Sequence, residues 1–210
     1  MIYLLRHAQT LWNYEMRKQG LNDSPLTPTG QRQALAYGRA LASLIPIEEV
    51  ESGKVLLHAS PLGRTRRTTQ YLVDALTIPE ESVRYEPLLI EFDYGDWSGL
   101  TNSEIESRFP GALDERESDK WFYQVPNGES YSDVEAKVDR WMDALPRERT
   151  IIVVTHSVVS RVIRRRFLDM DRSAASQLDH PQHLIYRLHE QRIDLIDCEP
   201  LCGATVDIPG

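Results

Sequence analysis

Ile2-Tyr-Leu-Leu-Arg-His-Ala-Gln-Thr10 opens the chain with four largely apolar residues, followed at once by an arginine and a histidine. The apolar run is too short for a helix and therefore predicts a buried strand. Arg6 and His7 then stand at the carboxyl end of this strand, where open α/β sheets bind their ligands. Two nitrogen-rich side chains at that place indicate an anionic ligand. A solvated strand end would explain an isolated Arg-His pair equally well, so the rest of the chain must discriminate.

The composition is that of an ordinary soluble globular protein. The 210 residues are 41% hydrophobic and 27% charged, which suits one domain with a substantial core. A formal net charge of −8 argues against nucleic-acid binding, and no apolar run reaches the roughly 20 residues of a membrane span. Because there is no secretory signal and only two cysteines, Cys198 and Cys202, we expect a cytoplasmic protein. The alternative for the two cysteines is a metal-binding pair.

Strand-like and helix-like segments alternate along the chain. After the first strand and an irregular stretch at 10–23, strands are predicted over 55–59, 83–89 (an edge strand), 151–155, 184–188 and 193–196. Helices are predicted over 31–44, from the turn at 60–64 to about 76, around 102–109, from 127–130 to about 144, and over 158–168. This order predicts a single three-layer α/β domain over residues 1–210, with a mostly parallel central sheet and helices on both faces. Residues of about 90–130 break the pattern, and we interpret them as a lid-like excursion over the sheet.

Three of the predicted strands end in side chains that suit a phosphate group. Arg6 and His7 follow the first strand, Arg64 lies just beyond the second, and His156 follows the strand at 151–155. If these strands are parallel neighbours, all four side chains meet at one edge, where guanidinium groups match phosphoryl oxygens. A metal site is the competing interpretation, but the arginines would repel a cation and no metal-ligand spacing is present. We therefore expect no metal and no cofactor.

Four blocks of sequence in a fixed order carry a more specific signal. They are Leu4-Leu-Arg-His-Ala-Gln-Thr-Leu-Trp-Asn13 with Gln19-Gly20 and Asp23-Ser-Pro-Leu-Thr27, then Ser60-Pro-Leu-Gly-Arg64, Glu91-Phe-Asp-Tyr-Gly-Asp-Trp-Ser-Gly99 and Val154-Thr-His-Ser157. Together they resemble the histidine phosphatase superfamily, the phosphoglycerate mutase-like proteins, over residues 2 to about 170. Ala8 and Ser157 depart from the family, which usually has glycine at both places, so the backbone geometry there is open.

The resemblance implies catalysis through a phosphohistidine. His7 would attack phosphorus as a neutral imidazole, with its other ring nitrogen donating to a backbone carbonyl. Arg6, Arg64 and His156 would bind the phosphoryl oxygens and offset the charge during transfer.

The leaving alcohol needs a proton, and the resemblance assigns this general acid to Glu91. Asp93 and Asp96 are alternatives close in sequence. The same resemblance implies a substrate-binding set that includes Asn13, Gln19, Gly20 and Ser157 in addition to Arg6, Arg64 and His156.

The remaining polar residues are interpreted as structural. We expect a core or edge position for His58, surface or loop positions for His180, His183 and His189, packing between excursion and sheet for 121–123, helix capping for Glu129, and a solvated helix face for 161–166.

A phosphohistidine can pass its phosphoryl group to water or to a second hydroxyl. The mutases of the family carry a longer insertion after the acid, with basic and aromatic residues that retain the intermediate. Here the segment 91–127 is shorter and rich in carboxylates, with Arg108, Arg116 and Lys120 as its only cations. We therefore favour a metal-independent phosphomonoesterase, a phosphoric monoester hydrolase that acts on a small phosphorylated metabolite. A phosphoglycerate mutase-type phosphomutase and a non-catalytic phosphate-ligand binding protein are the alternatives.

The expected partner is a small phosphorylated substrate, with no nucleic acid and no membrane. The sequence does not identify the phosphomonoester and leaves the oligomeric state open, with a homodimer as one candidate.

Overall fold

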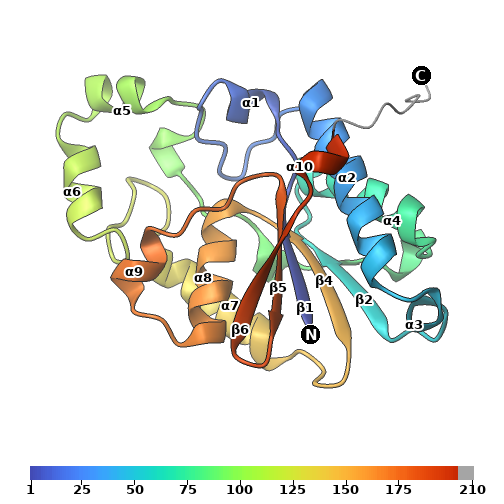
Figure 1. Cartoon of the computed structure of the whole chain (residues 1–210). Helices are drawn as coiled ribbons and strands as arrows, with labels where there is room; N and C mark the ends of the chain where they lie inside the picture. Colours follow the sequence, from blue (N-terminus) through green and yellow to red (C-terminus); the bar gives the residue numbers. More distant parts are fainter. Residues whose placement is uncertain (203–210) are drawn as a thin grey trace.

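The computed structural model describes residues 1–202 and contains one six-stranded sheet in the order β3-β2-β4-β1-β5-β6. Four strands are parallel: β3 (Arg84–Tyr85), β2 (Val55–Ala59), β4 (Thr150–Thr155) and β1 (Ile2–Arg6). The remaining two, β5 (Leu184–His189) and β6 (Arg192–Asp197), are antiparallel to their neighbours and close one side of the sheet (Figure 1). The predicted strands are confirmed, except that the edge strand of 83–89 shrinks to two residues before a 3₁₀ turn.

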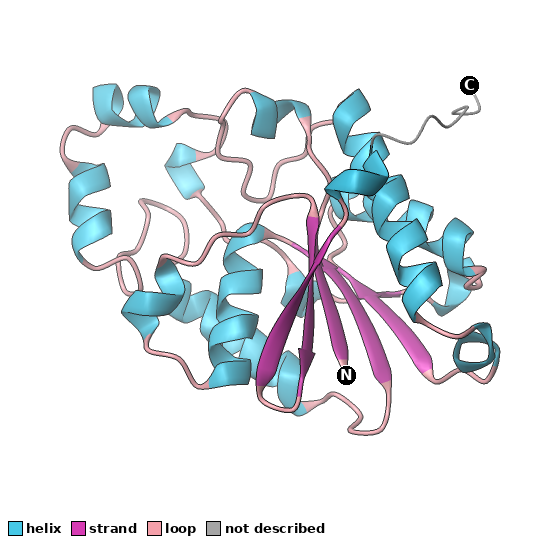
Figure 2. Ribbon diagram, in the orientation of Figure 1, coloured by secondary structure: helices cyan, strands magenta, loops and turns pink. Residues whose placement is uncertain are grey.

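Helices cover both faces of the sheet because its central strands bury alternate side chains on opposite sides. Leu4 of β1 packs in the cluster that includes α7 (Tyr131–Asp143) and α8 (Ser157–Leu168). The next residue, Leu5, packs in the cluster that includes α2 (Pro28–Leu44) and α4 (Gly63–Leu76). Figure 2 shows these two helical layers on either side of the strands. The predicted three-layer α/β fold is therefore confirmed.

Sequence periodicity missed mainly the short elements. The helix predicted over 31–44 begins at Pro28, because Thr27 caps it and proline suits the first helical turn. The shorter elements are α1 (Leu11–Tyr14), α3 (Ile47–Glu51), η1 (Glu80–Ser82), η2 (Pro87–Leu89), η3 (Gly95–Trp97), α5 (Asn102–Arg108), α6 (Ala112–Ser118), α9 (Arg172–Ser176) and α10 (Glu199–Cys202). Of these, only α5 was predicted from the sequence.

The excursion contains two helices, α5 and α6, which lie together at one end of the molecule (Figure 1). It is anchored by Trp97, Ile105 and Trp121, which are buried in the same cluster as α7 and α8. The predicted packing role holds for Trp121, whereas Phe122 is 54% exposed. A lid function for this segment stays a prediction.

Within residues 1–202, no helix is both long enough and apolar enough to cross a bilayer. Cys198 is buried, and the side chain of Cys202 lies outside the part of the chain that the structure describes, so a paired role for the two cysteines stays untested.

Candidate active site

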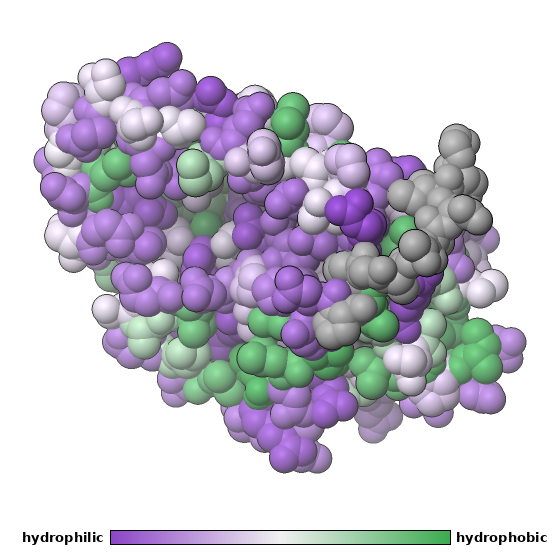
Figure 3. All heavy atoms as spheres, turned by 45° about the horizontal axis from the view of Figure 1, so that its top comes forward, coloured by the Kyte–Doolittle hydropathy of each residue, from purple (hydrophilic) through white to green (hydrophobic). Residues whose placement is uncertain are grey.

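The carboxyl ends of β1, β2 and β4 meet, as the sequence predicts, because these three strands are parallel neighbours. The rings of His7 and His156 lie 5.3 Å apart between centroids. Nε of Arg64 lies 3.3 Å from Nε2 of His7. A cavity of about 560 Å³ opens over this edge, and Arg6, His7 and Arg64 are part of its lining. Figure 3 looks onto this end of the molecule, which is largely hydrophilic around a hollow.

The surroundings of His7 hold it in one tautomer and in the neutral form. Its Nδ1 lies 2.9 Å from the carbonyl oxygen of Ala8, which can only accept, so Nδ1 carries the proton and Nε2 carries a lone pair. Burial lowers the pKa of His7 well below its usual value, and the nearby charges of Arg64 and Arg6 lower it further. The ring is therefore a neutral imidazole whose Nε2 can act as a nucleophile.

Two buried nitrogens in this cluster lack a hydrogen-bond partner among the residues that the structure describes: Nε of Arg6 and Nδ1 of His156. The other ring nitrogen of His156 lies 2.8 Å from the hydroxyl of Ser60. That hydroxyl also accepts from the amide of Leu62, and when it donates its own proton to His156, Nδ1 of His156 is the protonated nitrogen and a donor. A buried donor without a partner costs about 1–3 kcal/mol. An anionic oxygen bound among these residues would satisfy both groups.

Arg64 is held rigidly by residues from the loop before α2. Asp23 accepts from the amides of Gly63 and Arg64, at 2.6 and 3.1 Å, and so caps α4 in place of a local residue. The same carboxylate lies 2.9 Å from Nη1 of Arg64. The carbonyls of Gly20 and Asn22 accept from the two ends of the guanidinium, at 2.8 and 2.6 Å. These contacts direct the guanidinium so that its Nε faces His7.

Glu91 is 6% exposed and is part of the cavity lining. Burial raises its pKa above the usual value, while the positive charge of Arg64 opposes this rise. The two alternative acids have other partners: Asp93 accepts from the amide of Gly95, and Asp96 accepts from the side chain of Asn127. Glu91 also accepts from an amide, that of Phe92 at 3.0 Å, but unlike Asp93 and Asp96 it lines the cavity together with His7, which favours it as the candidate proton donor.

Of the substrate-binding residues implied by the resemblance, all but His156 line the cavity; His156 is fully buried behind its wall. Oδ1 of Asn13 accepts from Gln182, at 2.8 Å, so its amide NH₂ is the group left for an anion. Gln19 and Gly20 also make contacts within the protein. The side chain of Gln19 donates to the hydroxyl of Thr10. Gly20 adopts φ +55°, and its carbonyl accepts from Arg64.

Neither Ala8 nor Ser157 needs the conformational freedom of glycine. Both lie outside the positive-φ residues of the described chain. The amide of Ala8 donates to Thr68, and Ser157 begins α8 with its hydroxyl accepting from Arg161. The two departures from the family pattern therefore leave an ordinary backbone.

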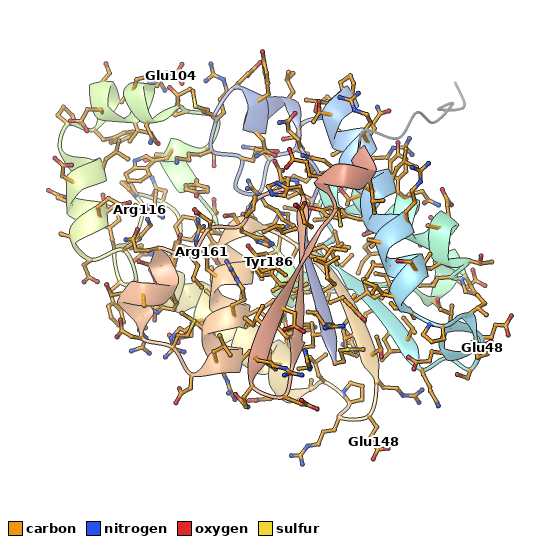
Figure 4. The ribbon with its side chains drawn as sticks, in the orientation of Figure 1. Glu48, Glu104, Arg116, Glu148, Arg161 and Tyr186 are labelled. Carbon is orange, nitrogen blue, oxygen red and sulfur yellow. The ribbon has the colours of Figure 1, made fainter. Side chains whose placement is uncertain are left out.

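Further cations that were not predicted from the sequence also line the cavity. The lining includes Lys18, Arg116, Lys120 and Arg161, and Figure 4 labels Arg116 on α6 and Arg161 on α8. The prediction of a solvated helix face for 161–166 is wrong. Arg161 follows Ser157 by one helical turn and so shares the face that meets the cavity, a spacing that could have indicated it.

The surface position predicted for His180 and the capping role predicted for Glu129 are both wrong. His180 is 3% exposed, and its carbonyl accepts from Nη1 of Arg6, because the segment before β5 passes beside the end of β1. Glu129 does not cap α7, since Ser130 does; Glu129 instead accepts from the amide of Asp93 and pairs with Lys137.

The other histidines lie where the sequence predicts. His58 is buried and accepts a hydrogen bond from the indole of Trp141, so it is a core histidine. His183 lies in the loop before β5, and His189 ends β5 beside Asp194.

Comparisons with known proteins agree with this geometry. A model of the histidine phosphatase superfamily (branch 1) matches residues 2–194. The chain is 36% identical over 187 residues to 6-phosphofructo-2-kinase/fructose-2,6-bisphosphatase of Caenorhabditis elegans, and 29% identical over 187 residues to fructose-2,6-bisphosphatase of Saccharomyces cerevisiae. Each match covers 89% of this chain and 38% of the relative, so the chain spans well under half the length of these curated relatives.

Solved structures of similar length match along most of the chain. Bacillus stearothermophilus YhfR has a TM-score of 0.77 and 26% identity, covering 93% of this chain and 95% of that one. A mycobacterial glucosyl-3-phosphoglycerate phosphatase has a TM-score of 0.74 and 26% identity, covering 93% and 96%. With two histidines, two arginines and a buried carboxyl group in place, and with the family model matching nearly end to end, the chain belongs to the histidine phosphatase superfamily.

Proposed function

We propose that this protein is a phosphomonoesterase that hydrolyses a small phosphorylated metabolite through a phosphohistidine on His7. The observation that carries the proposal is the neutral, buried imidazole of His7, with its Nε2 lone pair facing Nε of Arg64. Nε of Arg6 and Nδ1 of His156 are the donors that a phosphoryl group would satisfy. Arg6 and Arg64 supply the positive charge that phosphoryl transfer requires, so no metal ion is needed for that task.

Two displacements complete the reaction. Nε2 of His7 attacks phosphorus, the bond from phosphorus to the ester oxygen breaks, and Glu91 gives its proton to the departing alcohol. The Glu91 carboxylate then takes a proton from water as the water oxygen attacks phosphorus and the bond from phosphorus to nitrogen breaks. Inorganic phosphate leaves, and His7 and Glu91 return to their starting forms.

The cation content of the excursion does not explain why the phosphohistidine would pass its phosphoryl group to water and not to a hydroxyl of the substrate. The low count of cations in the excursion suggested poor retention of the intermediate, but Arg116 and Lys120 both line the cavity. The number of cations in the excursion therefore does not distinguish a hydrolase from a mutase. Support for hydrolysis comes instead from the names of both relatives, which include a bisphosphatase, and from the structural neighbour that is called a glucosyl-3-phosphoglycerate phosphatase.

The same cations narrow the class of substrate. Arg116, Lys120 and Arg161 line the cavity that His7 also lines, so a ligand bound there meets positive charge beyond that of Arg6 and Arg64. The fructose-2,6-bisphosphatase relatives are named for an ester with two phosphates, and the glucosyl-3-phosphoglycerate phosphatase for one that also has a carboxylate. We infer that the substrate carries a second anionic group besides the phosphate that is removed.

Phosphate release from a panel of esters, with a metal chelator present, tests the proposal. The panel contains fructose 2,6-bisphosphate, 3-phosphoglycerate and an aryl phosphate. We expect chelator-resistant release, and an acid-labile phosphoenzyme that is absent from His7→Ala. This variant should lose turnover by about 10⁴-fold or more, as removal of a nucleophile does, while a control variant at His183, in the loop before β5, should keep it.

Other outcomes would refute hydrolysis. Isomerisation of 3-phosphoglycerate without phosphate release would identify a mutase. Tight binding of the esters by both wild type and His7→Ala, with no turnover by either, would identify a binding protein.

A further inference from the structure

Lys18 occupies a junction between two segments that border the cavity. Its amide donates to the carbonyl of Leu100 at 2.9 Å, and its carbonyl accepts from the amide of Gly99 at 2.7 Å. Gly99 adopts φ +82°, a left-handed conformation that glycine allows at no steric cost. These two bonds tie the loop that carries Gly20 to the start of the excursion. The backbone of Lys18 is therefore fixed on both sides.

The side chain of Lys18 lines the cavity without a counterion. It is half-buried, and Nζ lies 5.8 Å from the centroid of the Tyr94 ring. Across residues 1–202, no hydrogen bond or ion pair joins its ammonium to the protein. The charged and titratable groups around it are Arg17, Tyr94, Arg116, Glu117, Lys120 and Arg161.

The carboxylates near Lys18 are already engaged. Glu117 lies 3.0 Å from Nζ of Lys120 and 3.5 Å from Nη1 of Arg116. Arg17 pairs with Glu104 at 2.7 Å. Lys18 thus adds positive charge to a region that is already cationic, an arrangement that costs free energy unless an anion binds there.

We propose that Lys18 sets the specificity of this enzyme for esters with a second anionic group, which its ammonium binds together with the neighbouring cations. The proposal rests on the proposed function and refines it. Lys18 adds to this group of cations a charge that can be lost near neutral pH.

The pKa of Lys18 is lowered to about 8, first by burial and then by the charges of Arg116 and Lys120. A bound anion favours the ammonium and raises this pKa again. The free enzyme therefore carries the charge below about pH 8 and loses it above, and an anionic group binds less tightly as the pH rises. Phosphate esters stay fully ionised over this range, because their second pKa is about 6, so the ligand itself does not change charge.

Steady-state kinetics at pH 7, 8 and 9 tests this proposal with two variants. The probes are fructose 2,6-bisphosphate, which has two anionic groups, and an aryl phosphate, which has one. If the enzyme binds the bisphosphate without turning it over, the inhibition constant of the bisphosphate against the aryl phosphate is measured in place of its KM. For wild type, we expect the bisphosphate KM to rise about tenfold from pH 7 to pH 9, following the loss of the ammonium. Lys18→Met should show a KM raised about tenfold at pH 7, the effect of losing a charged hydrogen bond, and no further rise with pH.

Lys18→Arg is the decisive variant, because arginine keeps its charge at every pH used. It should bind the bisphosphate as wild type does at pH 7 and should keep that KM at pH 9. The aryl phosphate KM should be the same in all variants at each pH. Lys54→Met, which removes an exposed lysine just before β2, is the matched control and should behave as wild type.

Two results would overturn the proposal: an unchanged bisphosphate KM in Lys18→Met, or a rise of KM with pH that persists in Lys18→Arg. Normal turnover of the aryl phosphate in those experiments would show that the phosphatase function survives while the role of Lys18 does not. Phosphate release from neither ester by wild type would instead refute the proposed function, and the role of Lys18 with it.

Discussion

Burial acts in opposite directions on His7, the proposed nucleophile, and on Glu91, the proposed acid. It lowers the pKa of His7 and raises the pKa of Glu91, because each group is less stable charged than neutral away from water. A neutral imidazole can attack, and a neutral carboxyl group can donate a proton. One physical cause therefore shifts both groups toward the state that the proposed first displacement needs.

The acid role of Glu91 predicts a dependence on the leaving group. In Glu91→Gln, release from alkyl phosphates should fall by about 10²–10⁴-fold, the usual contribution of a general acid. Release from an aryl phosphate should fall much less, because a phenolate leaves without protonation. Asp96→Asn, which removes the competing exposed carboxylate, should retain activity on both ester types. Equal losses on alkyl and aryl esters in Glu91→Gln would argue against proton donation.

At the scale of elements, α8 serves both the cavity and the packing of its neighbours. Arg161 faces the cavity, and Arg165, one turn later, pairs with Glu135 of α7 at 2.7 Å. Glu135 also accepts from Arg172 of α9 and from the indole of Trp121, both at 3.1 Å. A single buried carboxylate thus joins three helices to the end of the excursion.

Removal of this carboxylate predicts a large loss of stability. Glu135→Ala leaves cations and a buried indole N–H without their acceptor, and should lower the free energy of unfolding by about 3 kcal/mol. Asp143→Ala, at the other end of α7, removes an ion pair with Arg166. The side chain of Asp143 is 70% exposed and that of Arg166 is 46% exposed, so this change should lower the free energy of unfolding by less than about 0.5 kcal/mol. Urea unfolding of both variants measures the difference. Similar losses in the two variants would show that Glu135 does not join these helices energetically.

For the whole molecule, the site imposes a dependence of stability on pH. His7, His58, His156 and His180 are buried, and the pKa of each is lowered, first by desolvation. For His58 the folded-state pKa falls to about 4, below the value of about 6.5 in an unfolded chain. The unfolded chain therefore binds more protons than the folded chain between these pH values. The contribution of the neutral His58 to the free energy of unfolding is fully present above about pH 6.5 and is lost as the pH falls toward about 4.

Urea unfolding at pH 7.5, 6 and 5 should show this loss in wild type, at up to about 1.4 kcal/mol per pH unit for each histidine. His58→Gln keeps an acceptor for the indole of Trp141 but does not titrate, so its stability should fall less steeply with acid. An equally steep fall in wild type and His58→Gln would exclude His58 as a contributor.

The features that could be predicted are those set by neighbouring residues along the chain. Ile2–Arg6 and Thr150–Thr155 are apolar at successive positions, and such short runs are stable only as strands buried on both faces. Parallel neighbours place their carboxyl ends together, so Arg6, His7 and His156 could be expected to meet before any coordinates were available. Arg64, just beyond the second predicted strand, could be expected at the same edge, whereas Glu91 required the family resemblance because no local periodicity indicates it.

The remaining features depend on contacts between segments far apart in sequence. Asp23 caps α4 forty residues later, His180 accepts from Arg6 across most of the chain, and Lys18 meets cations from two different helices. Charge and burial at these places arise only when the segments pack together, because desolvation and Coulomb energy depend on distance in space. Local sequence thus specifies the strands and the polar side chains at their carboxyl ends, whereas folding creates the cationic cavity and the shifted pKa values.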